Sequence, residues 1–139
     1  MTIHRGGAED AEKSVNRLTE RVIGLCIEVH KHLGPGLLES AYQTCLAFEL
    51  EEAGLSFEKE VHLPIRYKGR TLEANYRMDF VVEDRLVLEI KAVETLLPIH
   101  EAQILTYLRL SGHSVGLLIN FNTNLLKQGI KRLVHTLQE

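Results

Sequence analysis

The apolar residues of this chain change from helical to strand spacing at Gly54, and that change limits the folds that are open to it. From Val15 onward they recur at steps of three and four residues, which predicts a helix that ends at Gly34-Pro35-Gly36. We expect a second helix from about Leu37 to near Gly54. Its buried side is expected to carry Leu38, Ala41, Tyr42, Cys45 and Phe48.

After Gly54 the pattern is typical of strands. Phe57 to Tyr67 is rich in β-branched and aromatic residues, and Pro64 within it indicates an edge strand or a bulge. A turn at Lys68-Gly69-Arg70 separates this strand from the next, Thr71 to Asn75. The first part of the sheet is therefore expected to be an antiparallel hairpin.

Two further strands, Arg77 to Val82 and Leu86 to Lys91, look central and are joined by the polar residues 83–85. A helix over residues 99–111 and an apolar strand over residues 115–119 follow, and the tail after Gly129 fits either a short helix or a strand. This order predicts an α/β (α+β) fold with a mixed β-sheet flanked by helices.

Length and composition indicate one globular domain. The chain has 139 residues, 45% hydrophobic and 25% charged, so it can bury a core, and disorder is excluded for most of it. We expect a flexible leader over residues 1–10 and a single domain over residues 11–139. A formal charge of -3 excludes a generally basic nucleic-acid coat, so any nucleic-acid site must be local. No apolar run approaches the ~20 residues of a membrane span, and we expect a cytoplasmic protein.

Three charged residues of the central hairpin fall on one face of the sheet, namely Asp79, Glu89 and Lys91. A three-residue loop pairs Val82 with Leu86, and this register places Asp79 opposite Glu89 with Cβ atoms ~5 Å apart. Like charges that face each other on a sheet are destabilising unless a cation or a proton lies between them. The Lys91 ammonium supplies part of the required positive charge, and Mg²⁺ or Mn²⁺ could supply the rest. The spacing alone fits equally well a solvated face with modest salt bridges.

A family resemblance favours the metal site. Asp79, followed ten residues later by Glu89-Ile90-Lys91, resembles the signature of the PD-(D/E)xK nuclease superfamily, although Met78 replaces the proline that often precedes the aspartate. The stretch from Gly36 to Tyr42 matches the name-giving motif of the GxxExxY family, a small branch of that superfamily.

A third motif points the same way, since Gln103 and Tyr107 reproduce the QxxxY helix motif of RecB-like nucleases. The resemblance runs from about residue 15 to residue 135. It implies a restriction-endonuclease-like fold.

The resemblance also implies roles for individual residues. Asp79 and Glu89 resemble the principal metal ligands, with the Ile90 backbone carbonyl as a third contact, and Glu39 resembles the helix carboxylate that completes the metal shell. Lys91 would orient the attacking water and stabilise charge in the transition state.

Four other residues are expected to line the cleft. Gln103 and Tyr107 share one helix face and would shape the cleft. Tyr42 is a supporting residue that could also belong to the core, and Arg77 is either a phosphate contact or a neutraliser of Glu39.

The resulting hypothesis is a nuclease that hydrolyses phosphodiester bonds, in DNA, with Mg²⁺ or Mn²⁺. The expected partner is nucleic acid, with a targeting protein and a homodimer as further expectations. Two alternatives stay open at this point. One is a nucleic-acid-binding or protein-binding module that keeps the fold with little catalysis, and the other is a structural homodimer whose carboxylates bind metal only for stability.

Overall fold

A computed structural model describes the backbone of residues 3–136 and the side chains of residues 11–136. The elements are, in order, α1 (Ile3–Leu33), α2 (Glu39–Glu52), β1 (Phe57–Tyr67), β2 (Arg70–Val82), β3 (Leu86–Lys91), α3 (Pro98–Ser111), β4 (Val115–Asn120), a short 3₁₀ helix η1 (Leu126–Gly129) and β5 (Ile130–Val134). The strands form one sheet in the order β1-β2-β3-β4-β5. Strands β3 and β4 are parallel, because α3 carries the chain from one to the other, and the remaining neighbours are antiparallel. The predicted mixed sheet flanked by helices is thus confirmed.

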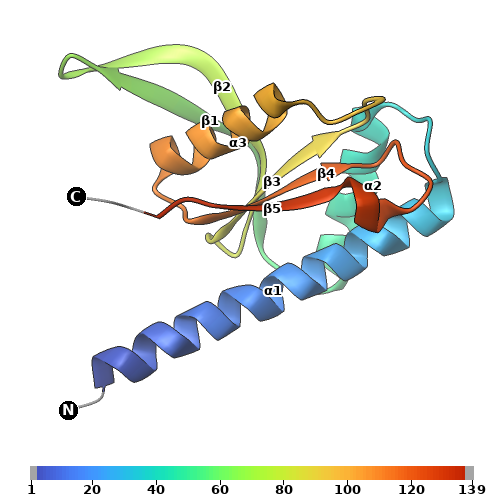
Figure 1. The fold of residues 1–139 in the computed structure, drawn as a ribbon, viewed down its shortest axis with the longest axis horizontal. Helices are drawn as coiled ribbons and strands as arrows, with labels where there is room; N and C mark the ends of the chain where they lie inside the picture. Colours follow the sequence, from blue (N-terminus) through green and yellow to red (C-terminus); the bar gives the residue numbers. More distant parts are fainter. Residues whose placement is uncertain (1–2, 137–139) are drawn as a thin grey trace.

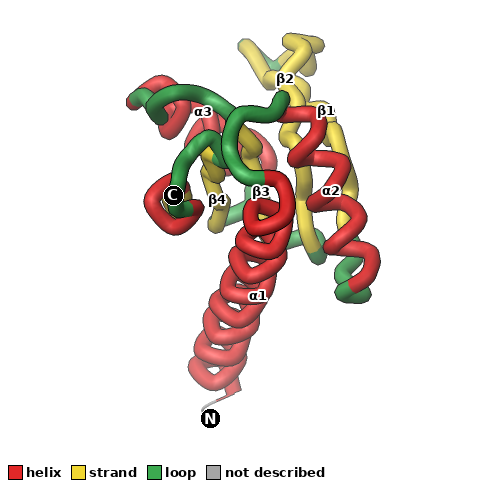
Figure 2. Tube along the Cα trace, turned by 90° about the vertical axis from the view of Figure 1, so that its right-hand side faces the viewer, coloured by secondary structure: helices red, strands yellow, loops and turns green. Residues whose placement is uncertain are grey.

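Helices cover both faces of the sheet (Figures 1 and 2). On one face α1 and α2 pack on the apolar side chains of β2, β3 and β4, among them Phe80, Leu88 and Leu117. On the other face Ile104 and Leu108 of α3 pack on a second, smaller cluster. In the part of the chain that the structure describes, no helix combines the length and apolar character that a bilayer crossing needs.

Several boundaries differ from the expectations. Helix α1 reaches back to Ile3, through most of the segment that was expected to be a leader. The two strands predicted for residues 71–75 and 77–82 form one continuous strand, β2, in which Asn75 has a positive φ of 59°. The tail contains both η1 and β5, so the open question there is answered by a strand that follows a short helix.

Helix α2 buries Tyr42, as predicted, but the rest of its buried stripe differs from the predicted one. Tyr42, Leu46 and Leu50 are fully buried, whereas Leu38 and Phe48 are 78% and 58% exposed. The three buried residues lie four apart and so form one line along the helix. The stripe that faces the sheet is therefore rotated from the one that the apolar pattern favoured.

The hairpin of β1 and β2 extends well beyond the rest of the sheet (Figure 1). Both indications drawn from Pro64 are confirmed, since β1 is an edge strand and its register shifts between Leu63 and Ile65. At the far end Tyr67 pairs with Arg70 around a two-residue turn.

Candidate active site

The candidate site lies where β2 and β3 separate. These strands pair only from Phe80 to Val82 with Leu86 to Leu88, and the predicted pairing of Val82 with Leu86 is confirmed. Beyond the last pair, β2 continues along β1 and β3 continues along β4. Asp79 and Glu89 are the first residues past the separation, one on each strand. We call this point the fork.

Each fork carboxylate accepts a backbone hydrogen bond from the opposite strand. The N–H of Asp79 donates to Glu89 Oε1 at 3.1 Å, and the N–H of Ile90 donates to Asp79 Oδ2 at 2.8 Å. Strand pairing has ended here, so side chains take the place of carbonyl oxygens as acceptors. The two hydrogen bonds hold both carboxylates at the fork.

Burial makes this carboxylate pair costly in its ionised form. Glu89 is only 4% exposed, and burial together with the charge of Asp79 raises its pKa to about 8. Burial also raises the pKa of Asp79, against the lowering effect of the Ile90 N–H and of Lys91. A proton or a cation close to the pair therefore stabilises the folded protein.

The charged residues around the fork act on the pair unequally. Lys91 lowers the pKa of both carboxyl groups, whereas Glu39 raises the pKa of both. Arg77 lowers the pKa of Asp79, and its Nη1 atom lies 3.8 Å from Glu60 Oε1. The positive charge of Arg77 thus offsets part of the negative charge of Asp79, while the guanidinium is paired with Glu60 on the surface.

The turn before α2 explains how Glu39 comes near the fork. Gly36 has a φ of 99°, a conformation that glycine adopts without strain. The hydroxyl of Tyr42 donates to the Gly34 carbonyl at 2.6 Å and accepts the N–H of Leu37 at 3.1 Å. These contacts fix the turn and place Glu39 in the first turn of the helix.

Tyr42 does not line the cleft, so its assignment as a cleft residue is wrong. Its side chain is fully buried, and its ring stacks on Phe121 with centroids 4.5 Å apart. The tyrosine of the GxxExxY motif therefore has a structural role here, as a clamp on the turn that carries Glu39.

A hollow of about 500 Å³ adjoins the fork on the α3 side of the sheet. Gln103 and Tyr107 both line it, and the Gln103 amide donates to the Tyr107 hydroxyl oxygen at 2.9 Å. Lys91 and Tyr76 form part of the opposite wall, with the Tyr76 ring centroid 6.1 Å from that of Tyr107. Burial and the negative charge of Glu89 raise the pKa of Tyr107, so its phenol stays protonated. Lys91 links this hollow to the fork.

Tyr76 is a wall residue that the sequence analysis missed. Its only signal in the sequence is an aromatic residue on the strand that leads to Asp79, three positions earlier. Such residues are common on strands, so this signal is weak.

The donor set at the fork fits a hydrated Mg²⁺ ion. Among the side chains of residues 11–136, no three of the His, Cys, Asp and Glu residues lie close enough to form a metal-binding cluster. Glu39 is near enough to raise the pKa of both fork carboxyl groups, and its role as a third metal ligand stays a prediction. Mg²⁺ is ordinarily held by one or two carboxylates together with several waters. The carboxylates of half-buried Asp79 and buried Glu89 match that protein contribution.

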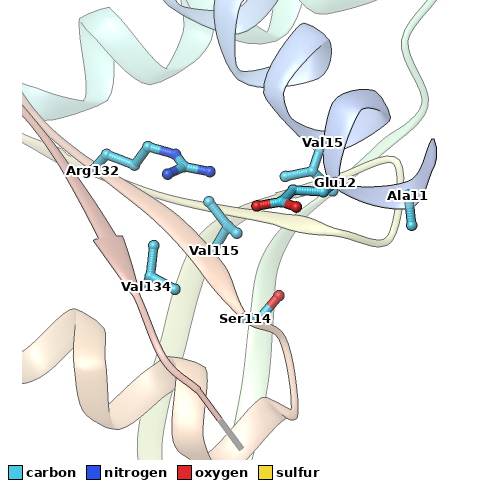
Figure 3. A pocket seen from close by; sticks show the side chains of 7 residues that line it. All are labelled: Ala11, Glu12, Val15, Ser114, Val115, Arg132 and Val134. Carbon is cyan, nitrogen blue, oxygen red and sulfur yellow. The ribbon is translucent and has the colours of Figure 1, made fainter. Parts of the chain in front are cut away.

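A second hollow lies away from the fork, between α1 and the strands β4 and β5 (Figure 3). Arg132 extends across it above Val115, and its Nη2 atom donates to Asn16 Oδ1 at 2.9 Å. The lining side chains are mainly apolar and include no carboxylate pair. This second hollow is therefore not part of the candidate site.

Comparisons with known proteins show the superfamily and the fold of the chain. The family model of the PD-(D/E)XK nuclease superfamily matches residues 16–133, a range that includes the fork, the turn before α2 and helix α3. The crystal structure of SSO0001 is similar to the chain with a TM-score of 0.55 and 22% identity, over 71% of this chain and 50% of that chain. The chain thus spans half the length of that structure, and the likeness concerns the fold alone. No curated protein matches the chain significantly.

Proposed function

The chain belongs to the PD-(D/E)XK nuclease superfamily, and on that premise we propose that it hydrolyses phosphodiester bonds in DNA with Mg²⁺ or Mn²⁺ as cofactor. The observation that carries the proposal is the fork, where half-buried Asp79 and buried Glu89 form an acidic pair beside Lys91. A module freed from catalysis has no physical need for such a pair, because two buried carboxylates destabilise the fold unless a positive charge or a proton compensates them.

We place the chain in the GxxExxY branch with a RecB-like helix motif. The turn built by Gly36 and Tyr42 supports the first assignment, and the hydrogen-bonded pair Gln103 and Tyr107 supports the second. A targeting protein, a homodimer and a cytoplasmic location stay predictions.

In the proposed mechanism Asp79 and Glu89 would hold the ion, with the Ile90 carbonyl as a further donor. An ion held there would lower the pKa of its water and would place positive charge beside the phosphate. The Lys91 ammonium orients the attacking water and hydrogen-bonds a phosphate oxygen as negative charge develops on it. Gln103 already donates to the Tyr107 oxygen, which leaves the phenol proton of Tyr107 free to bind a second phosphate oxygen.

The deciding experiment is cleavage of supercoiled, linear, branched and single-stranded DNA with Mn²⁺. Lys91→Ala is expected to lower turnover by about 10²–10³-fold, with DNA affinity nearly unchanged, because it removes a group that acts mainly in the transition state. Asp79→Asn is expected to abolish cleavage. The matched control is Lys31→Ala, which removes a lysine whose side chain is 69% exposed on α1 and should cleave normally.

Each alternative outcome has a distinct meaning. Equal cleavage by wild type and Asp79→Asn would show that the activity does not come from the fork and would overturn the proposal. Metal-dependent DNA binding without cleavage of any substrate would favour the binding module.

A further inference from the structure

The end of the β1–β2 hairpin is the most basic projecting segment of this acidic chain. We call residues 65–72 the arm tip. It carries Arg66, Lys68 and Arg70 and no Asp or Glu, in a chain whose formal charge is -3. The arm tip projects away from the sheet and beyond α3 in both views (Figures 1 and 2). Three positive charges are therefore held clear of the acidic body of the protein.

These three cations are not used within the fold. In the described range 11–136, none of them takes part in a salt bridge. The Arg66 Nη1 atom reaches only the Thr71 hydroxyl, at 3.5 Å, and Lys68 Nζ lies 5.5 Å from the centroid of the Tyr67 ring. Arg70 is exposed. All three charges are accordingly available to a ligand.

The turn presents one of these charges at the apex. Lys68 and Gly69 have φ values of 50° and 79°, the pattern of a type I′ hairpin turn. Asn, Asp or Gly is favoured at the first of these positions, so the lysine is not explained by turn formation. Tyr67 and Leu72 beside it are 57% and 44% exposed, which adds apolar contact surface next to the cations.

The arm connects directly to the candidate active site. Tyr76, at its base, lines the hollow together with Lys91. Asp79 at the fork lies opposite Glu60, and Arg70 at the arm tip pairs with Tyr67, so the arm spans seven residues of β1, or about 23 Å for an extended strand. Duplex DNA advances roughly 3.4 Å per base pair, so this reach corresponds to about seven base pairs.

We propose that the arm tip binds the phosphate backbone of a nucleic-acid duplex about seven base pairs from the fork. A two-stranded ribbon has the width that the major groove of B-DNA accepts, and arginine and lysine side chains supply most contacts to phosphate. The inference rests on the proposed function, because the fork defines where the duplex enters. It adds a substrate class, a duplex that extends beyond the cleaved bond.

The test compares two variants with equal loss of charge. Arg66→Ala/Lys68→Ala/Arg70→Ala removes the cations of the arm tip. The control, Lys13→Ala/Arg17→Ala/Lys31→Ala, removes three exposed cations from α1. Fluorescence anisotropy measures the binding of labelled blunt duplexes of about 6, 12 and 24 base pairs, lengths that bracket the proposed reach. Ca²⁺ replaces Mg²⁺, and salt is varied between about 50 and 200 mM.

For the long duplexes the arm variant is expected to bind at least tenfold more weakly than the control at low salt. A plot of log affinity against log salt concentration should be less steep for the arm variant. The magnitude of its slope should fall by about 2 to 3, which is about 0.9 for each lost phosphate contact. On the shortest duplex the two variants should bind alike. Hydrolysis of bis(p-nitrophenyl) phosphate, which is too small to reach the arm, should be unchanged.

Equal binding of long duplexes by both variants would overturn the inference. The inference would also be overturned if the arm variant lost affinity only for single-stranded DNA, or only for vesicles of anionic phospholipid. Failure of the proposed function gives a different pattern. A wild-type protein that cleaves nothing, while the arm variant still loses duplex binding, would remove the catalytic proposal and retain the arm.

Discussion

Replacing Glu89 by Gln should make the metal-free protein more stable while it removes the metal site. Glutamine keeps the size of the side chain and an oxygen that can accept the Asp79 N–H, but it carries no charge. In the folded protein the pKa of Glu89 is about 8, against an ordinary value of 4.5. At pH 7 the folded state therefore binds a proton that the unfolded state has released.

The pKa difference sets the magnitude and the sign of the effect. The interval from 4.5 to pH 7 is two and a half units, and at about 1.4 kcal/mol per unit the cost to the folded state is about 3 kcal/mol. Because this pKa is raised on folding, the stability of the wild type is greatest below 4.5 and falls as the pH rises towards 8. The glutamine side chain does not titrate, so the variant should lack this decline.

Urea unfolding in EDTA, followed by circular dichroism at several pH values, measures the effect. Glu89→Gln is expected to exceed the wild type by up to about 3 kcal/mol at pH 7, and the gain should shrink to a fraction of that near pH 5. The matched control is Glu20→Gln, an exposed glutamate of α1, which should leave the stability profile unchanged. A variant no more stable than wild type at pH 7, or a gain independent of pH, would refute the argument that Glu89 is buried at a cost.

Two further predictions concern packing, and both use the same urea assay. Tyr42→Phe should lower stability by about 1–3 kcal/mol, because it leaves the Gly34 carbonyl and the Leu37 N–H without their hydroxyl partner. Gly116→Val should cost about 1–3 kcal/mol, since a Cβ atom there would lie 2.9 Å from the Cδ1 atom of Ile104 on α3. An unchanged unfolding midpoint in either variant would contradict the packing described for that residue.

The sequence predicted the parts of the fold that local spacing determines. The three-residue loop after Val82 fixed the hairpin register, and that register placed Asp79 and Glu89 at equivalent positions on their strands. The local sequence could not show that β2 and β3 separate there. The separation depends on the pairing of β2 with β1 and of β3 with β4, which joins residues distant in the chain. The backbone hydrogen bonds accepted by the two carboxylates follow from that separation.

Side-chain environments were harder to predict than elements. Tyr42 and Phe48 lie on α2 and Leu38 directly precedes it, and the spacing of these positions fits two adjacent stripes. Packing against the sheet buries Tyr42 and exposes the other two. The cleft assignment of Tyr42 failed for the same reason, since only the folded turn reveals the partners of its hydroxyl.

The central claim is that Asp79 and Glu89 together hold one divalent ion, and isothermal titration calorimetry with Mn²⁺ or Mg²⁺ tests it most directly. The account predicts one ion per chain for the wild type and release of close to one proton at pH 7, because metal binding must displace the proton on Glu89. Asp79→Asn should lose this binding, whereas Asp84→Asn, in the loop between β2 and β3, should retain it. Absence of binding by the wild type, or undiminished binding by Asp79→Asn, would contradict the account.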